Sequence, residues 1–340
     1  MNNSTRILVV GPAWVGDMVM AQSMFRLIKM REPKATIDVV APAWTKPLLA
    51  RMPEVNEAIA MPLGHGQLQL GLRWNLGRQL RDRHYNRAII LPRSFKSAIT
   101  PFAAKAALRT GYIGEMRWGL LNDARRLDKD ALPRTVDRFN YLALEPGEEL
   151  PEITPLPRLV TGVDEAEARL QALGSARPDS PVLGLCPGAE YGPAKRWPVE
   201  HFASVARSMR DRGWAVWLFG SGKDVDATRA IAELTGEGCL DLGGKTSLGE
   251  AIDLMAMCTA VVSNDSGLMH VAAATDRPLV AIYGSSDPGF TPPLNEKASI
   301  LRLGLDCSPC FRRECPLGHT RCLTEITPEQ VIGALQRRQV

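Results

Sequence analysis

Residues 6–30 read RILVVGPAWVGDMVMAQSMFRLIKM, an apolar run followed by a turn and then by a pattern typical of a helix. This stretch decides the fold class, because the same order recurs along the chain. Further β-rich runs lie at residues 36–41, 87–92 and 110–114, and then at 181–188, 214–220, 260–265 and 278–284. Strands that alternate with helices indicate right-handed βαβ crossovers and parallel sheets. The sequence therefore predicts an α/β protein with two parallel sheets.

The length of 340 residues also favours two domains. Residues 145–160 contain four prolines and several acids, a composition typical of an extended linker. We therefore expect an N-terminal domain over residues 1–150, a connecting region over 151–180 and a C-terminal domain over 181–340. Near the end, TPEQ at residues 327–330 predicts the start of a terminal helix, with a capping hydroxyl followed by proline.

Composition and charge narrow the classes of function. Hydrophobic residues make up 45% of the chain and charged residues 23%, as in ordinary soluble proteins. The apolar run near the N-terminus is too short for a secretory signal, so we expect a cytoplasmic protein. Residues 1–144 carry 22 Lys and Arg against 11 Asp and Glu, a net charge of +11, whereas the remainder carries −7. The first half therefore suits an anionic partner, such as nucleic acid, a phosphorylated glycolipid or a membrane surface. A solvated basic face is the alternative.

The first turn, GPAWVGD at residues 11–17, is neither GxGxxG nor a Walker A loop. Asp17 stands where a phosphate-binding loop would carry Lys, and its carboxylate would repel phosphate. A carboxylate at the carboxyl end of a strand can act as a general base toward an attacking hydroxyl. The alternative is that Asp17 only caps its helix.

Loops of the second half suit a diphosphate. The Gly-rich segment at 187–198 begins with Pro187-Gly188 and leads to Lys195, which can neutralise phosphate charge. SNDSGLMH at 263–270 predicts a strand, a tight turn and a helix whose N-terminal amides favour an anion. Within it, His270 taken alone is more typical of a structural histidine. Asp224 lies in a formal DxD pattern, which we interpret as a helix start with a ribose-binding carboxylate rather than a metal site.

Four segments together resemble a known family. They are GPAWVGDMVMAQS at 11–23, PGAEYGPAKRWP at 187–198, SNDSGLMHVAAA at 263–274 and CSPCFRRECPLGHTRCL at 307–323. In this order they resemble the lipopolysaccharide heptosyltransferases, and the first two are similar to the branch that adds the second heptose. The resemblance implies the GT-B architecture, in which two Rossmann-like domains face a central cleft. The N-terminal domain would bind the acceptor and the C-terminal domain the sugar nucleotide.

The implied reaction transfers L-glycero-D-manno-heptose from ADP-heptose to the first heptose of the lipopolysaccharide inner core, heptosyl-Kdo2-lipid A. It inverts the anomeric centre and requires no metal or other cofactor. The implied partners are this donor and acceptor and the cytoplasmic face of the inner membrane, which the protein would contact peripherally, without nucleic acid.

The resemblance also assigns roles to residues. The base is Asp17 and the phosphate-binding lysine is Lys195. The donor site further includes residues on four loops of the second half: Gly188, Asp224, Thr246, Asp265, Ser266, Gly267, Leu268 and His270. Acceptor contacts are expected among four cations of the first half: Arg93, Lys96, Arg109 and Arg117.

A cluster of four cysteines allows more than one interpretation of the site and of the function. Four thiols at short spacing, Cys307, Cys310, Cys315 and Cys322, can hold a structural zinc, although their spacing is not that of a standard zinc ribbon. The alternative is a reduced cluster without metal, and we assign no metal ligands. Two other functions remain: a sugar-nucleotide epimerase on the same plan, and a nucleic-acid-binding protein with a four-cysteine zinc site. The epimerase function does not explain the positive charge of the first half. The nucleic-acid-binding function does not explain the diphosphate-type loops of the second half.

Overall fold

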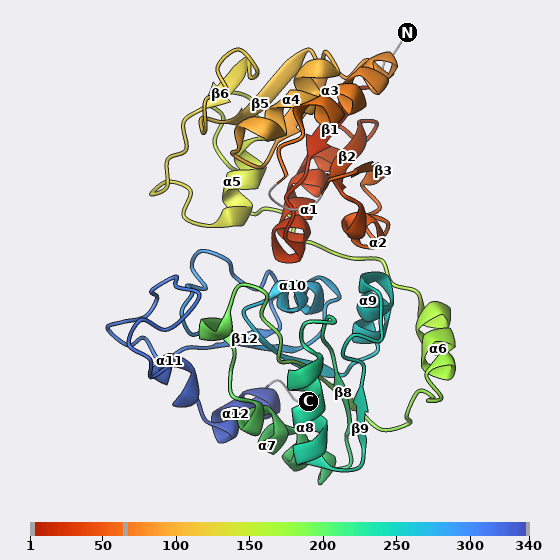
Figure 1. Ribbon diagram of the computed structural model, residues 1–340, viewed down its shortest axis with the longest axis vertical. Helices are drawn as coiled ribbons and strands as arrows, with labels where there is room; N and C mark the ends of the chain where they lie inside the picture. Colours follow the sequence, from red (N-terminus) through yellow and green to blue (C-terminus); the bar gives the residue numbers. More distant parts are fainter. Residues whose placement is uncertain (1–3, 64–66, 338–340) are drawn as a thin grey trace. The chain divides into compact units, whose positions relative to one another are not determined.

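The computed structural model of the protein describes residues 4–63 and 67–337. The chain divides between Pro157 and Arg158 into two compact units, which Figure 1 draws in red to yellow and in green to blue. The division lies inside residues 151–180, the stretch predicted as a connecting region. Part of this stretch is a helix rather than a linker, because α6 (Val163–Ala172) packs against α9 (Leu248–Ala256). This helix therefore belongs to the second unit.

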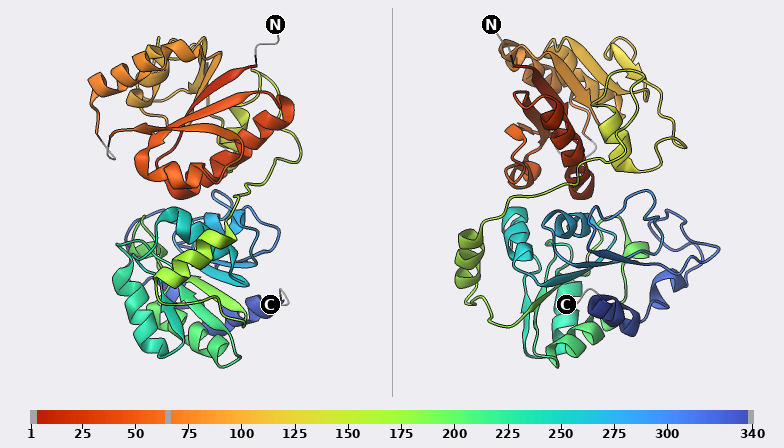
Figure 2. Two further views of the ribbon diagram at one scale, coloured as in Figure 1. Left: turned by 90° about the vertical axis from the view of Figure 1, so that its right-hand side faces the viewer. Right: turned by 180° about the vertical axis from the view of Figure 1, so that it is seen from behind.

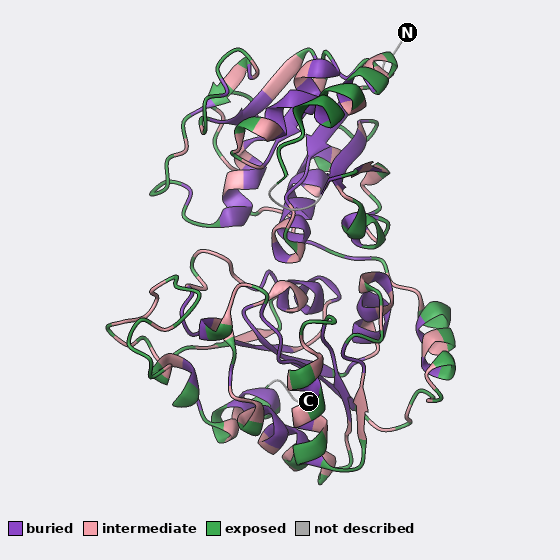
Figure 3. Cartoon of the chain, viewed as in Figure 1, coloured by how far each residue is buried: buried purple, intermediate pink, exposed green. Residues whose placement is uncertain are grey.

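The first unit is built on a parallel sheet of six strands in the order β3-β2-β1-β4-β5-β6. Its central strands are apolar and buried, as expected for a parallel sheet covered on both faces (Figure 3). The strands are β1 (Arg6–Val10), β2 (Thr36–Pro42), β3 (Val55–Met61), β4 (Arg87–Ile90), β5 (Leu108–Tyr112) and β6 (Asp123–Arg125).

Helices cover both faces of this sheet. Leu8 and Val10 of β1 pack into the core cluster on the side of α3 and α4. On the other face α1 packs against α5, and the Asn140 side chain donates a hydrogen bond to Ser23 Oγ at 3.0 Å. The helices are α1 (Val15–Arg31), α2 (Lys46–Leu49), α3 (Leu70–Gln79), α4 (Ile99–Ala103) and α5 (Thr135–Tyr141), with 3-10 turns η1 (Ala43–Thr45), η2 (Arg81–Arg83) and η3 (Phe95–Ala98).

The second unit repeats the plan with a parallel sheet in the order β12-β11-β10-β7-β8-β9. Figure 2 shows helices on both of its faces. The core cluster joins this sheet to α7, α8 and α12, while α9 and α10 pack together elsewhere on the unit. The strands are β7 (Val182–Cys186), β8 (Ala215–Leu218), β9 (Cys239–Asp241), β10 (Ala260–Asn264), β11 (Leu279–Ile282) and β12 (Ala298–Leu301). The remaining helices are α7 (Val199–Arg210), α8 (Val225–Thr235), α10 (Gly267–Ala274), α11 (Arg321–Thr324) and α12 (Pro328–Arg337), with the 3-10 turn η4 (Pro193–Lys195).

The predicted α/β class with two parallel sheets is confirmed, and each predicted run forms or overlaps a strand. The predicted terminal helix is also confirmed: Thr327 and Gln330 cap α12 reciprocally, through bonds of 2.8 and 3.4 Å. The strands that the sequence analysis did not foresee are β3, β6, β9 and β12, which are the edges of the two sheets. Edge strands are only partly buried, so their sequences lack the continuous apolar run of a central strand.

In each sheet the chain order reverses between two central strands, β1 and β4 in the first and β7 and β10 in the second. Sheets of this type bind ligands beyond the carboxyl ends of the strands at such a reversal. The loops after these strands are therefore the places to look for a site. No helix among the described residues has the length and apolar character needed to span a membrane.

Candidate active site

The two loops at the reversal of the second sheet are joined by a buried asparagine. Asn264 ends β10, and its side-chain NH2 donates to the carbonyl oxygen of Pro187, after β7, at 2.6 Å. Its Oδ1 accepts the backbone N–H of Trp197 at 3.1 Å. The predicted donor loops 187–198 and 265–268 are therefore held side by side at the carboxyl edge.

Lys195 and Asp265 form an ion pair between these loops. Lys195 Nζ lies 2.5 Å from Asp265 Oδ2, with side chains 17% and 5% exposed. Ser286, which follows β11, donates its hydroxyl to the same carboxylate oxygen. The Lys195 ammonium also lies 5.0 Å from the centre of the Tyr191 ring. The Lys195 ammonium is thus held in a partly buried position beside the N-terminus of α10, where amides and the helix dipole favour an anion.

His270 lies in the first turns of α10, close to this pair, and is buried. Burial lowers its pKa to about 4, with the Lys195 cation acting in the same direction and Asp265 in the opposite one. The imidazole is therefore neutral at physiological pH. This favours the structural interpretation of His270 over acid–base chemistry.

The depressed pKa of His270 predicts an acid-sensitive second unit. As pH falls from about 6.5 to about 4, the unfolded chain takes up a proton that the folded unit does not. The free energy of unfolding should therefore be unaffected above pH 6.5 and fall by up to about 3 kcal/mol below it. Urea unfolding followed by fluorescence of the buried Trp197 and Trp217 measures this loss. His270→Gln should remove it, whereas substitution of the exposed His319 should not; an unchanged pH slope in His270→Gln would contradict the assignment.

Two further donor-site candidates, Gly188 and Asp224, are neighbours. Asp224 stands at the N-cap position of α8, but its carboxylate accepts hydrogen bonds from the Ser221 amide and hydroxyl, at 2.9 and 2.7 Å, rather than from the helix. A Cβ on Gly188 would lie 2.5 Å from the Cγ of this carboxylate, so a side chain there would require Asp224 to move. Thr246 lies in the loop after β9, directly before the Ser247 cap of α9. All the predicted donor residues thus lie in loops or helix starts after β7, β8, β9 and β10.

Asp17 lies at the reversal of the first sheet, in the first turn of α1. The N-cap position of α1 is Trp14, so Asp17 does not occupy the cap position that was its alternative reading. Asp17 is half-buried. The loop after the neighbouring strand β4 carries Arg93, exposed, and Lys96, half-buried. A carboxylate and two cations therefore follow adjacent strands at one edge.

The other two cations predicted to contact an acceptor are used in the structure of the unit itself. Arg117 is only 3% exposed, and its guanidinium donates to the carbonyl oxygens of Pro92 and Tyr112. Arg109 lies near the amino end of β5 and donates to the carbonyl oxygens of Leu120 and Ala106, both at 2.7 Å. Burial lowers the pKa of both guanidinium groups. Most of their donors therefore bind backbone carbonyl oxygens, and contact of these two arginines with an acceptor stays a prediction.

The sequence profile of Glycosyltransferase family 9 (heptosyltransferase) matches residues 73–321, which include most of the first unit and nearly all of the second. The chain belongs to this family of heptosyltransferases. Lipopolysaccharide heptosyltransferase 2 of Salmonella typhimurium is 52% identical over 97% of both chains, and its Escherichia coli counterpart is 50% identical over the same shares. The solved structure of E. coli ADP-heptose lps heptosyltransferase II matches over 98% of both chains at 46% identity, with a TM-score of 0.88.

Family 9 membership makes this protein a glycosyltransferase and confirms the resemblance drawn from the four segments. It also removes the reasons to favour an epimerase or a nucleic-acid-binding protein.

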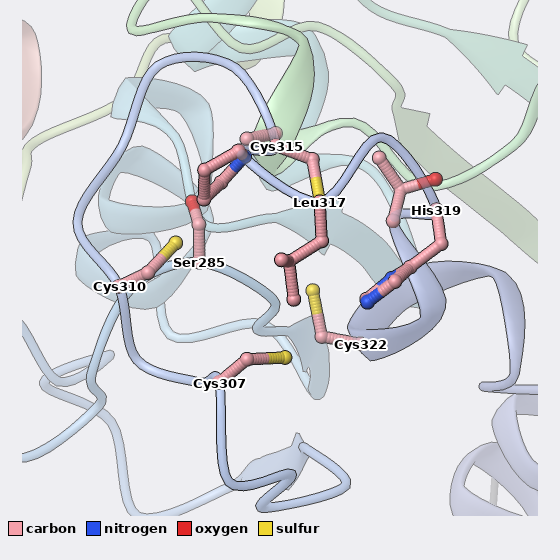
Figure 4. Close-up of a pocket in the computed structure, with 10 residues that line it drawn as sticks. Ser285, Cys307, Cys310, Cys315, Leu317, His319 and Cys322 are labelled. Atoms are coloured by element: carbon pink, nitrogen blue, oxygen red, sulfur yellow. The ribbon is translucent and has the colours of Figure 1, made fainter.

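Four of the seven cysteines of this heptosyltransferase line one pocket, with Ser285 and His319 beside them (Figure 4): Cys307, Cys310, Cys315 and Cys322. All are free thiols. Backbone amides, that of Thr320 foremost, lower the pKa of Cys315, whereas burial raises that of Cys322. Within residues 4–63 and 67–337, no three or more His, Cys, Asp or Glu side chains are grouped to hold a metal ion. Zinc binding by the cluster therefore stays a hypothesis.

The cysteine-rich segment supports the lysine loop. Ala194, next to Lys195, donates its N–H to the Arg313 carbonyl oxygen at 3.0 Å, and Tyr191 donates its hydroxyl to that of Phe311 at 2.7 Å. A Cβ on Gly192 would lie 2.5 Å from the Arg313 oxygen. The segment thus packs directly on the loop that carries the candidate cation.

Three residues of this site were not among the predicted ones. Asn264 joins the two loops, Ser286 holds Asp265, and the Tyr191 ring lies beside Lys195. Asn264 and Tyr191 lie inside two of the segments that the sequence analysis assigned to the donor site. Their place in those segments was the signal that could have identified them as site residues. Ser286 follows a strand in a sequence without other signals, and only the adjacency of β10 and β11 brings it to the site.

Proposed function

We propose that this protein transfers L-glycero-D-manno-heptose from ADP-heptose to the first heptose of the lipopolysaccharide inner core. The observation that carries the proposal is the identity of about half of all residues, along the full chain, with enzymes named heptosyltransferase 2. The arrangement of the loops at the carboxyl edge of the second sheet supports it, because the partly buried Lys195 ammonium beside the N-terminus of α10 suits a diphosphate leaving group.

The second unit is proposed to bind the donor. The diphosphate lies against the amides that begin α10, at Ser266, Gly267 and Leu268, and against Lys195. Gly188 leaves room for the sugar nucleotide beside Asp224, whose carboxylate accepts a ribose hydroxyl. The backbone at Thr246 contacts adenine. Asp265 and His270 position Lys195 and the start of the helix rather than touch the reacting atoms.

The first unit is proposed to bind the acceptor, heptosyl-Kdo2-lipid A, whose carboxylates and phosphates suit its positive charge. Arg93 and Lys96 are the proposed contacts, because they follow β4 at the same edge as Asp17. Asp17 removes the proton from the acceptor hydroxyl, and that oxygen attacks the anomeric carbon on the face opposite ADP. The bond from the anomeric carbon to the phosphate oxygen breaks, and ADP leaves with its electrons. One displacement of this kind inverts the anomeric centre.

The charge that grows on the departing ADP is stabilised by Lys195 and by the amides near Ser266. No metal is assigned a role in the proposal, since a lysine and a helix N-terminus supply the positive charge. The proposed location is the cytoplasm, with peripheral contact at the inner membrane, where the lipid acceptor resides.

The proposal predicts selective binding of ADP by the metal-free protein. In calorimetric titrations after EDTA treatment, ADP should bind, whereas UDP and NAD should bind at least about tenfold more weakly. UDP lacks the adenine, and the diphosphate of NAD is esterified at both ends, so it offers less negative charge to Lys195 and to the amides of α10. The same preparation should transfer heptose to heptosyl-Kdo2-lipid A. Selective binding of UDP or NAD would remove ADP-heptose as the donor, and activity that returns only with added metal would contradict the metal-independent mechanism.

A further inference from the structure

Helix α3 exposes most of its large apolar residues and buries an arginine, the reverse of an ordinary surface helix. Its buried residues are Arg73 and Gly77, whereas Leu70, Leu72 and Trp74 are between 40% and 44% exposed. Gly77 allows close packing on α4, since a Cβ there would lie 2.4 Å from the Thr100 carbonyl oxygen. A surface helix ordinarily buries its leucines and exposes its arginine. Figure 3 draws much of α3 as exposed.

The guanidinium of the buried arginine donates hydrogen bonds to backbone carbonyl oxygens of the residues just before the helix. Arg73 donates from Nε to the carbonyl oxygen of Leu68 at 2.8 Å and from its NH2 group to that of Gln67 at 2.9 Å. The orientation of α3 is therefore specified by packing and hydrogen bonds. The exposure of its leucines and tryptophan is a consequence of that orientation.

An open apolar groove of about 400 Å³ runs beside this helix. Leu70 and Trp74 of α3 form one wall, and the remaining walls are Phe95, Ile99, Phe102 and Leu120. The Trp74 and Phe102 rings lie 6.1 Å apart at their centres. Single exposed leucines need no explanation, but a continuous apolar groove at the surface marks a binding surface.

Several cations lie close in the chain to residues that line this groove. Arg78 lies one turn beyond Trp74 on α3, Lys96 follows Phe95, and Lys105 lies three residues after Phe102. The Arg109 guanidinium lies 5.4 Å from the centre of the Phe102 ring. An acid, Glu115, also lies here, and its carboxylate accepts the Phe95 amide at 2.7 Å. Aromatic and leucine side chains ringed by lysine and arginine are the composition of surfaces that lie in the interface of an anionic bilayer.

We propose that α3 and this groove are the surface by which the protein binds an anionic phospholipid bilayer. Leu70, Leu72 and Trp74 enter the headgroup region, and the surrounding cations contact lipid phosphates. A second copy of the chain is a poorer occupant, because self-pairing would bring two positive rims together. The inference deepens the proposed function and rests on it in one respect: a lipid acceptor requires the enzyme to work at a membrane.

The test is co-sedimentation of the full-length protein with vesicles of phosphatidylethanolamine and phosphatidylglycerol, compared with vesicles of phosphatidylcholine. Binding should require the anionic lipid. The variant Leu70→Gln/Leu72→Gln should lower the bound fraction by roughly tenfold, and Lys105→Glu, at an exposed site that cannot disturb the core, by roughly threefold. The matched controls lie on α8 of the second unit, where Leu234 and Arg229 are also exposed: Leu234→Gln and Arg229→Glu should bind as the unsubstituted protein does.

A second readout separates this surface from the proposed reaction. ADP affinity and transfer to a deacylated, water-soluble acceptor should be unchanged in the α3 variant, whereas transfer to acceptor embedded in vesicles should fall with binding. If no transfer is found with any acceptor, the proposed function fails and the vesicle result still stands by itself. Unchanged vesicle binding in both variants would overturn the surface, as would a dimer of the unsubstituted protein that the α3 variant dissociates.

Discussion

Transfer activity should fall by about three orders of magnitude in Asp17→Asn, while affinity for ADP stays unchanged. The amide keeps the size of the carboxylate but cannot accept a proton from the acceptor hydroxyl. The structural cost should be small, because the N-cap of α1 is Trp14 and a carboxylate in the first turn contributes only about 0.3–1 kcal/mol through the helix dipole. Initial rates of transfer and calorimetric ADP titrations measure the two quantities.

A matched control is Asp82→Asn, which removes an exposed carboxylate from the same unit. It should leave both quantities as they are. Weakened ADP binding in Asp17→Asn would refute the division of tasks between the units, and transfer at more than about a tenth of the normal rate would refute the role of Asp17 as base. The variant should also lose the acidic limb of the pH–rate profile, which a merely structural role of Asp17 would leave in place.

Lys195→Ala should weaken ADP binding by about 10- to 100-fold and slow transfer by a further factor of about 100. The first effect comes from the lost charge-assisted hydrogen bonds to the diphosphate. A second contribution comes from Asp265, whose nearly buried carboxylate would lose its cation and repel the phosphates. The slower transfer follows because the charge on ADP is greatest as the glycosidic bond forms and the phosphate leaves.

The control for this variant is Lys223→Ala, in a neighbouring loop of the same unit. Lys223 pairs with Glu190 at 2.5 Å, as Lys195 pairs with Asp265, but its side chain is 72% exposed. An exposed pair contributes little, so Lys223→Ala should bind ADP and react normally. Equal losses in the two variants would indicate a general charge effect and not a phosphate site at Lys195. Thermal unfolding of both variants shows whether either loss reflects misfolding.

The loops of the proposed donor site stand out in the sequence because they combine local signals. Glycine, a capping residue and a cation follow an apolar run in PGAEYGPAKRWP and SNDSGLMH, and each signal lies within a few residues of the next. The acceptor side lacked such signals. Arg93, Lys96, Arg109 and Arg117 look alike in a sequence. In the structure Arg117 is buried and donates to the carbonyl oxygens of Pro92 and Tyr112, and Arg109 donates to those of Ala106 and Leu120. Burial of a single arginine follows from tertiary packing, which composition does not report.

The sequence by itself determined the α/β class, the central strands, the two-part organisation and the loops that carry the candidate chemistry. These depend on apolar periodicity and turn residues, which act over a few neighbours. Only the tertiary structure decided that Asn264 joins the loops, that Lys195 pairs with Asp265 beside Ser286, and that α3 exposes its leucines. The first two depend on contacts between segments about 20 to 80 residues apart, which the order of strands in the sheet brings together. The third depends on which face of the helix packs inward, and the packing of Gly77 and the hydrogen bonds of Arg73 set that face.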